Sequence, residues 1–297
     1  MSVYQPSPDI FVVGTVSLDV LHLANGQTVH AAGGAGMYTA LAAHHAGARV
    51  GLFAPRPEPM PKLLQPIAER VDWLGPIITP ENLSRLEIVH HGSGRATLLH
   101  ASWGAEAQLT AEMMPGEVSQ ARIVHIAALS TAKRQLDFLQ AIKKSSKRAR
   151  EQRGRSLRIS VGTYARLVYG DPERVRQLFE EADLFFMNEN EANGLFGSVD
   201  KARTRVGALL FVTLGEAGAL VIEGEQVTHA PGQPATELDP TGAGDTFCGA
   251  TLAGLVQGRS PIEAARQAVA LAARTVGAVG PGALLGTGSC HYFDFSG

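Results

Sequence analysis

The chain has few cysteines, few aromatic residues and almost no net charge. Its two cysteines, Cys248 and Cys290, are too few for a disulfide framework and favour a reducing cytoplasm. Aromatic residues make up 6% and the formal net charge is −2, so the chain lacks the basic surface and aromatic platform typical of nucleic-acid binding. No apolar run is long enough to cross a membrane, and residues 1–8 lack the pattern of a signal peptide. We therefore expect no nucleic-acid partner and no membrane association.

Several familiar site signatures are also missing. There is no Walker-type phosphate loop, and no glycine fingerprint directly follows the first strand, which argues against a dinucleotide-dependent oxidoreductase. The ten histidines show no metal-ligand spacing, because adjacent pairs such as His90-His91 diverge on a strand or helix. The basic run over residues 143–158 is typical of a solvated helix end.

What is present is an alternation of strand and helix patterns in a chain that is 45% apolar. This alternation predicts an α/β architecture with a mainly parallel sheet, and we expect residues 1–297 to form a single domain. The expected strands are 10–14, 49–54, 123–127, 157–161, 184–187, 209–213 and 219–222. The expected helices are 34–46, 131–150, 172–182, 190–196, 245–257 and 261–276.

Two stretches, about residues 16–31 and 84–103, interrupt the alternation. Both have extended, turn-linked patterns, and the second contains a hairpin-like turn at His91–Arg95. Two such hairpins inserted into an α/β core predict a small β-lid over a cleft. An unpaired edge of that lid would allow a second copy to pair with it as a homodimer. Residues 55–61 read as a rigid, extended connector.

The most informative motif is the segment from Asp239 to Phe247. Gly242, Ala243 and Gly244 permit a tight turn at the start of an apolar helix, where backbone N–H groups bind anions such as phosphate. Asp245 follows within this anion site, and a carboxylate there suits a base for a substrate hydroxyl. The alternative is an ordinary capped helix after a Pro-Thr-Gly turn.

Other candidate site residues lie near expected strand ends. Asn188 and Glu191 follow a buried strand, where they would hold a hydrated Mg²⁺ or simply cap the next helix. Asp19 would bind the paired hydroxyls of a sugar or polyol, or lie in a surface turn. The pair Gly33-Gly34 allows close approach of a ligand or tight helix packing.

In this order, the segments between residues 11 and 281 resemble the ribokinase-like, or PfkB, carbohydrate kinase family. The resemblance implies a three-layer αβα core with a small β-lid. It implies that Asp245 is the catalytic base and that Gly242 to Gly244 form the anion hole. It places Asp19, Gly33 and Gly34 at the sugar, and Asn188 and Glu191 at phosphate and Mg²⁺.

The resemblance also implies a nucleotide site and its chemistry. ATP would lie along the segment from Thr213 to Gly215 and near Thr241, while Asp245 removes a proton from a substrate hydroxyl. A K⁺ ion near Asp239 is a weaker expectation. On the final helix, the residues expected beside adenine are Ala270, Ala273 and Val276.

The departures from the family pattern concern the acceptor. Tyr38 stands where the family often has Asn, Ser17 stands where ribokinases commonly have Asn, and residues 55–61 replace a Gly-x-Asp segment. The favoured interpretation is a cytoplasmic ATP-dependent kinase that acts on a primary alcohol of a small sugar or polyol. The alternatives are a nucleoside kinase, for which Tyr38 and Trp103 are candidate aromatic contacts, and a non-catalytic sensor that binds nucleotide or sugar.

Overall fold

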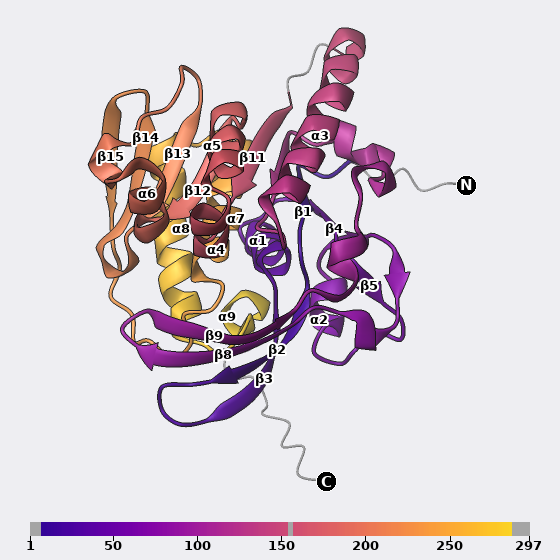
Figure 1. Cartoon of the computed structure of the whole chain (residues 1–297), viewed down its shortest axis with the longest axis vertical. Helices are drawn as coiled ribbons and strands as arrows, with labels where there is room; N and C mark the ends of the chain where they lie inside the picture. Colours follow the sequence, from indigo (N-terminus) through magenta and orange to yellow (C-terminus); the bar gives the residue numbers. More distant parts are fainter. Residues whose placement is uncertain (1–6, 154–156, 287–297) are drawn as a thin grey trace.

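The computed structural model describes residues 7–153 and 157–286, and its centre is a nine-stranded sheet (Figure 1). Seven neighbouring strands run parallel, and a hairpin adds two antiparallel strands at one edge. In spatial order the strands are β15 (Gln226–Pro231), β14 (Gly218–Glu223), β13 (Leu209–Thr213), β12 (Leu184–Asn188), β11 (Arg158–Gly162), β10 (Ile123–Ile126), β1 (Ile10–Val13), β4 (Val50–Phe53) and β6 (Asp72–Leu74).

Helices cover both faces of this sheet. The helices α1 (Ala35–His45), α7 (Ala243–Val256) and α8 (Pro261–Val276) share one apolar core with the sheet. A second core on the opposite face contains α3 (Ala132–Arg153), α5 (Pro172–Glu181) and α6 (Glu189–Phe196). Strand β1 has the sequence Ile-Phe-Val-Val and is fully buried, because its side chains alternate between these two cores. The expected three-layer αβα fold is confirmed.

The remaining elements are short. They are α2 (Gln65–Ala68), α4 (Ala165–Gly170), α9 (Gly282–Leu285), the paired strands β5 (Arg56–Pro57) and β7 (Ile77–Ile78), and the 3₁₀ helices Pro80–Asn82, Gly104–Gln108, Ala111–Met113, Gly116–Gln120, Val199–Lys201 and Gly215–Ala217. In the described part of the chain, no helix has both the length and the apolar character that a membrane crossing requires.

A separate four-stranded sheet lies at the carboxyl ends of the central strands (Figure 1). Its strands are β3 (Thr28–Gly33), β2 (Ser17–His22), β8 (Arg85–Gly92) and β9 (Arg95–Ser102), in that order. Each hairpin is antiparallel, and the two join because β2 pairs in parallel with β8, more than 60 residues later in the chain. The outer strand β9 is largely exposed, with Leu98 at 45% and Leu99 at 57%.

The edge strands β6 and β15 were not predicted from the sequence. Strand β6 has three residues, too few for a periodic pattern, and β15 contains a histidine and ends in a proline. Edge strands bury little surface, so their residues need not be apolar. Cys248 is buried, whereas Cys290 lies outside the described residues.

Candidate active site

A pocket of about 510 Å³ lies between the carboxyl edge of the main sheet and the hairpin β8–β9. Its walls come from segments far apart in the sequence, which the parallel topology brings to one edge. The predicted site residues that line it are Asp19, Gly34, Tyr38, Asn188, Glu191, Thr213, Thr241, Gly242, Gly244 and Asp245.

The turn at the start of α7 has a conformation that requires glycine. Gly242 has φ of 74°, and a Cβ there would lie 2.4 Å from the ring of Tyr38. Helix α7 begins at Ala243, whose N–H donates to the Pro240 carbonyl at 3.3 Å, so the N–H groups of Gly244 and Asp245 are the candidate anion donors of the first turn. Tyr38, expected to contact the substrate, is 0% exposed, and its ring supports the turn from within the core.

Asp245 lies in the first turn of α7, partly exposed to the pocket. Burial raises the pKa of this carboxyl to about 7, and the negative charge of Glu191 contributes in the same direction. A carboxylate with a pKa near neutrality accepts a proton readily and still loses it at physiological pH. The position and the pKa of Asp245 both suit a general base.

Asn188 and Glu191 form a capping box at the start of α6. The Asn188 side chain accepts from the Glu191 N–H at 2.9 Å, and the Glu191 carboxylate accepts from the Asn188 N–H at 3.0 Å and its Nδ2 at 2.6 Å. Glu191 is buried, which raises its pKa to about 7 although the hydrogen bonds from Asn188 and Ala165 oppose the shift. The cap orients Glu191, and this carboxylate near Asp245 fits a hydrated Mg²⁺ held through water.

Asp19 and the glycine pair lie together at the other end of the pocket. Asp19 is 2% exposed on β2, and its Oδ1 accepts from the Leu86 N–H at 3.2 Å. A Cβ on Gly33 would lie 1.8 Å from Asp19 Oδ2, so this carboxylate fits only beside glycine. Gly34 has φ of 101° as it opens α1. Burial and the charge of Asp239 raise the pKa of Asp19 to about 7, although the hydrogen bond from the Leu86 N–H opposes this.

The residues predicted for the nucleotide divide into two groups. Thr213, at the end of β13, and Thr241 line the pocket near Asn188 and Gly242. The other four, Gly215, Ala270, Ala273 and Val276, lie outside the pocket. Of the helix residues in this group, Ala270 is exposed and the other two are half-buried, on a face of α8 turned away from its core.

The carboxylate of Asp239 is already surrounded by donors. Its Oδ1 accepts from the Thr241 N–H at 2.9 Å and lies 3.3 Å from His90 Nε2, while Oδ2 accepts from the Gly280 N–H at 2.7 Å. The side chains of His90 and Asp239 are 1% and 0% exposed. A K⁺ ion bound to this carboxylate would have to displace the imidazole, so these residues do not fit the expected monovalent-cation site.

Three pocket residues had little signal in the sequence. Trp103 and Tyr164 form an aromatic pair with ring centroids 6.5 Å apart, and both line the pocket. His125 lies on β10, where its Nδ1 is 2.8 Å from Ser160 Oγ and burial lowers its pKa to about 3. Trp103 was named as an aromatic candidate, but its pairing with Tyr164 joins segments 60 residues apart. A histidine inside the buried strand pattern of residues 123–126 was the available signal for His125.

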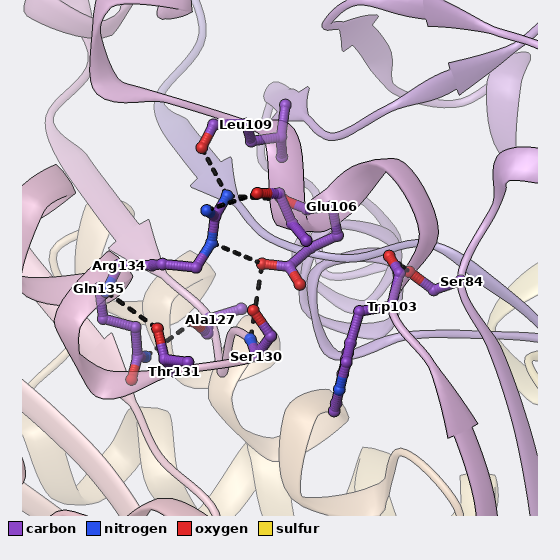
Figure 2. A network of polar contacts seen from close by, with 10 residues as sticks. Ser84, Trp103, Glu106, Leu109, Ala127, Ser130, Thr131, Arg134 and Gln135 are labelled. Carbon is purple, nitrogen blue, oxygen red and sulfur yellow. Dashed lines mark hydrogen bonds and ion pairs between the residues drawn. The ribbon is translucent and has the colours of Figure 1, made fainter.

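An ion pair fixes the turn that carries Trp103 (Figure 2). Arg134 on α3 donates its Nε to the buried carboxylate of Glu106 at 3.3 Å, and its guanidinium also donates to three backbone carbonyls of the following turn. On the other side, Ser84 Oγ donates to the Trp103 carbonyl at 2.8 Å. The backbone is therefore held on both sides of Trp103, which favours a preorganised wall of the pocket.

Comparisons with known proteins agree with this geometry. A cytidine kinase from Thermococcus kodakarensis is 30% identical over 265 residues, 86% of this chain and 91% of that protein. The structure of adenosine kinase from Sinorhizobium meliloti superposes with a TM-score of 0.74 at 18% identity, covering 93% of this chain and 95% of that one. The structure of ribokinase from Cryptococcus neoformans in complex with ADP gives 0.70 at 20% identity, covering 92% and 94%.

The family assignment rests on nearly the whole chain. Residues 8–287 match the pfkB family carbohydrate kinase pattern, which includes both sheets and the turn before α7. The architecture, the glycine turn with Asp245 and the relatives all point the same way. This chain belongs to the pfkB family of carbohydrate kinases.

Proposed function

We propose that this protein is an ATP-dependent kinase that transfers the γ-phosphate to the hydroxymethyl group of a nucleoside. The observation that carries the proposal is one pocket that holds Asp245 and Asp19 together with the aromatic pair Trp103 and Tyr164. A sugar needs polar contacts near the carboxylates, whereas a nucleobase also needs a flat apolar surface.

The reaction follows from the residues at the turn. Asp245, with its pKa raised to about 7, accepts the hydroxyl proton as the substrate oxygen attacks the γ-phosphorus. The bond from the γ-phosphorus to the bridging oxygen of ATP breaks, and ADP leaves with its electron pair. The N–H groups at the start of α7 stabilise the negative charge on the transferred group. Asn188 and Glu191 would hold Mg²⁺ through water, and the bound ion would neutralise part of the phosphate charge.

The acceptor end of the pocket supports a nucleoside. Asp19 and Gly34 both line the pocket, so Asp19 would accept hydrogen bonds from ribose hydroxyls and Gly34 would allow close approach. The hairpin β8–β9 contributes the apolar side chains of Leu86, Ile88 and Leu98 to the opposite wall. Together with Trp103, this apolar wall is better suited to a nucleobase than to a small, hydrated sugar. The names of the cytidine kinase and adenosine kinase relatives support the same acceptor class.

A sugar or polyol is the second candidate, and Asp19 with Gly33 is the observation that favours it. This part of the pocket does not require a nucleobase in the substrate. The Asp19 carboxylate beside Gly33 would bind vicinal hydroxyls of any sugar equally well. The ribokinase likeness supports the shared fold. A sensor without catalysis is disfavoured because it needs no carboxylate at the anion-binding turn.

The test is ADP release from MgATP with cytidine, adenosine, ribose, fructose and inositol as acceptors, for the wild type and Trp103→Ala. We expect the highest kcat/KM with a nucleoside, and a loss of about 5- to 150-fold in Trp103→Ala, since stacking on one base contributes about 1–3 kcal/mol. The variant should leave any weak ribose turnover unchanged. Faster turnover of ribose or fructose, with no effect of the substitution, would assign the sugar instead. ATP binding without any turnover would favour the sensor.

A further inference from the structure

The hairpin β8–β9 contacts the segment that leads into the anion-binding turn at two points. His90 on β8 places its Nε2 3.2 Å from Thr241 Oγ1 and 3.3 Å from Asp239 Oδ1. At the tip of the hairpin, the Gly94 N–H donates to the Glu237 carboxylate at 2.7 Å. These contacts join parts of the chain that are more than 140 residues apart.

The contact at His90 is buried. The side chains of His90 and Asp239 are 1% and 0% exposed, so bulk water does not separate the imidazole from the carboxylate. His90 Nε2 also reaches Thr241, the residue directly before Gly242. His90 therefore restrains the backbone from which the anion-binding turn begins.

The same hairpin forms the acceptor wall of the pocket. Leu86 and Ile88 on β8, with Ala96 and Leu98 on β9, line the pocket a few residues from His90. Leu238 packs against the apolar cluster of the small sheet, which also includes Ile88. The hairpin thus has one set of contacts to the acceptor space and another to the anion-binding turn.

We propose that His90 is a positioning residue for phosphoryl transfer, which holds the anion-binding turn in place from the hairpin. It acts through Asp239 and Thr241, at the carboxylate where a monovalent cation was expected. The imidazole occupies that side of Asp239, so the reaction needs no K⁺ ion there. This inference rests on the proposed phosphoryl transfer at Asp245, and it holds for either a nucleoside or a sugar as acceptor.

The experiment compares His90→Ala, His90→Gln and the neighbouring control His91→Ala, with cytidine and ribose as acceptor probes. His91 is exposed and its Nε2 contacts Thr97 on the hairpin itself, so its replacement tests the hairpin without the contact to Asp239. We expect kcat of His90→Ala to fall about 10-fold or more, because the segment before α7 loses its contacts with the imidazole at Asp239 and Thr241. The acceptor KM should change less than about 3-fold. His90→Gln keeps an N–H donor at similar reach and should recover most of kcat.

A second measurement uses the wild type alone and remains informative if His90→Ala does not fold. Wild-type rates in KCl and in choline chloride at equal ionic strength should agree within about 2-fold. A strong requirement for K⁺ would overturn the inference, as would equal kcat for the wild type and His90→Ala. A rise in acceptor KM with unchanged kcat would also overturn it. If the wild type phosphorylates neither probe nor any other acceptor of the panel, the proposed function fails and this inference fails with it.

Discussion

Replacing Asp245 by Asn should remove turnover and at the same time raise the resistance of the protein to thermal unfolding. The catalytic part follows from the loss of the general base, which contributes about 10²–10⁴-fold in comparable reactions. The stability part follows from the environment of the carboxyl. Burial and the charge of Glu191 raise its pKa from 3.8 to about 7 in the folded protein.

The sign and size of the stability effect come from linkage. The folded state binds the Asp245 proton more tightly than the unfolded state does, so this group lowers the free energy of unfolding as pH rises from about 4 through about 7. Each pKa unit corresponds to about 1.4 kcal/mol, which gives an upper limit of about 4 kcal/mol above pH 7. The favourable interaction of a carboxylate with a helix N-terminus offsets at most about 1 kcal/mol of the gain from Asn. The net gain at pH 8 is therefore about 2–3 kcal/mol.

The assay is thermal unfolding of the wild type and Asp245→Asn at pH 5 and pH 8, with ADP release measured on the same samples. The Tm of the variant should exceed that of the wild type by roughly 5 °C at pH 8, and by less at pH 5. Asp72→Asn is the matched control, because Asp72 is exposed on β6 outside the pocket. A Tm difference that is zero, negative or independent of pH would refute the electrostatic argument. Turnover within 10-fold of the wild type would refute the assignment of the base.

Three further predictions, made with four substitutions, test the site. In the wild type, kcat/KM should rise with pH to a plateau with a midpoint near 7, and Glu191→Gln should move this midpoint to lower pH, because the charge of Glu191 raises the pKa of Asp245; an unchanged midpoint would contradict the coupling. Gly242→Ala should lower Tm and reduce kcat by about 10-fold or more, since its φ is positive and its Cβ would meet an aromatic ring 2.4 Å away, whereas Gly244→Ala, which has open space for a Cβ, should keep the wild-type Tm. Arg134→Met should destabilise the protein by about 3–5 kcal/mol in denaturant unfolding, because it leaves a fully buried carboxylate unpaired, and a loss below about 1 kcal/mol would show that this ion pair is not required.

Much of the fold could be predicted because the central strands and the helices have strong local patterns. The residues of β1 and β12 form short buried runs, and α7 and α8 follow clear helix starts. These patterns depend on burial on both faces of a parallel sheet. The edge strands β6 and β15 lack that burial, so they left no comparable pattern.

The candidate site was predictable where its chemistry is local in sequence. Gly242 and Asp245 belong to one turn, so their spacing in the sequence is enough to predict a carboxylate beside an anion-binding site. The packing of Tyr38 against the anion-binding turn was not predictable, because its ring on α1 lies beside Gly242 at the start of α7. The contact between His90 and Asp239 was missed for the same reason, since it depends on the path of a hairpin 150 residues away. Pairings of this kind require the three-dimensional structure.

The chemistry of this pocket is best understood from three of its carboxyl groups together. Asp19, Glu191 and Asp245 each have a pKa near 7, and in each case burial is the largest cause. At neutral pH each group is therefore partly protonated when no ligand is bound. The folded protein is then destabilised less than it would be by three fully ionised carboxylates. Hydroxyl donors at Asp19, or Mg²⁺ near Glu191, favour the ionised forms, so ligand binding should release protons to solvent. The charge of Glu191 also raises the pKa of Asp245, so the pH dependence of the reaction depends on both carboxyl groups and not on Asp245 alone.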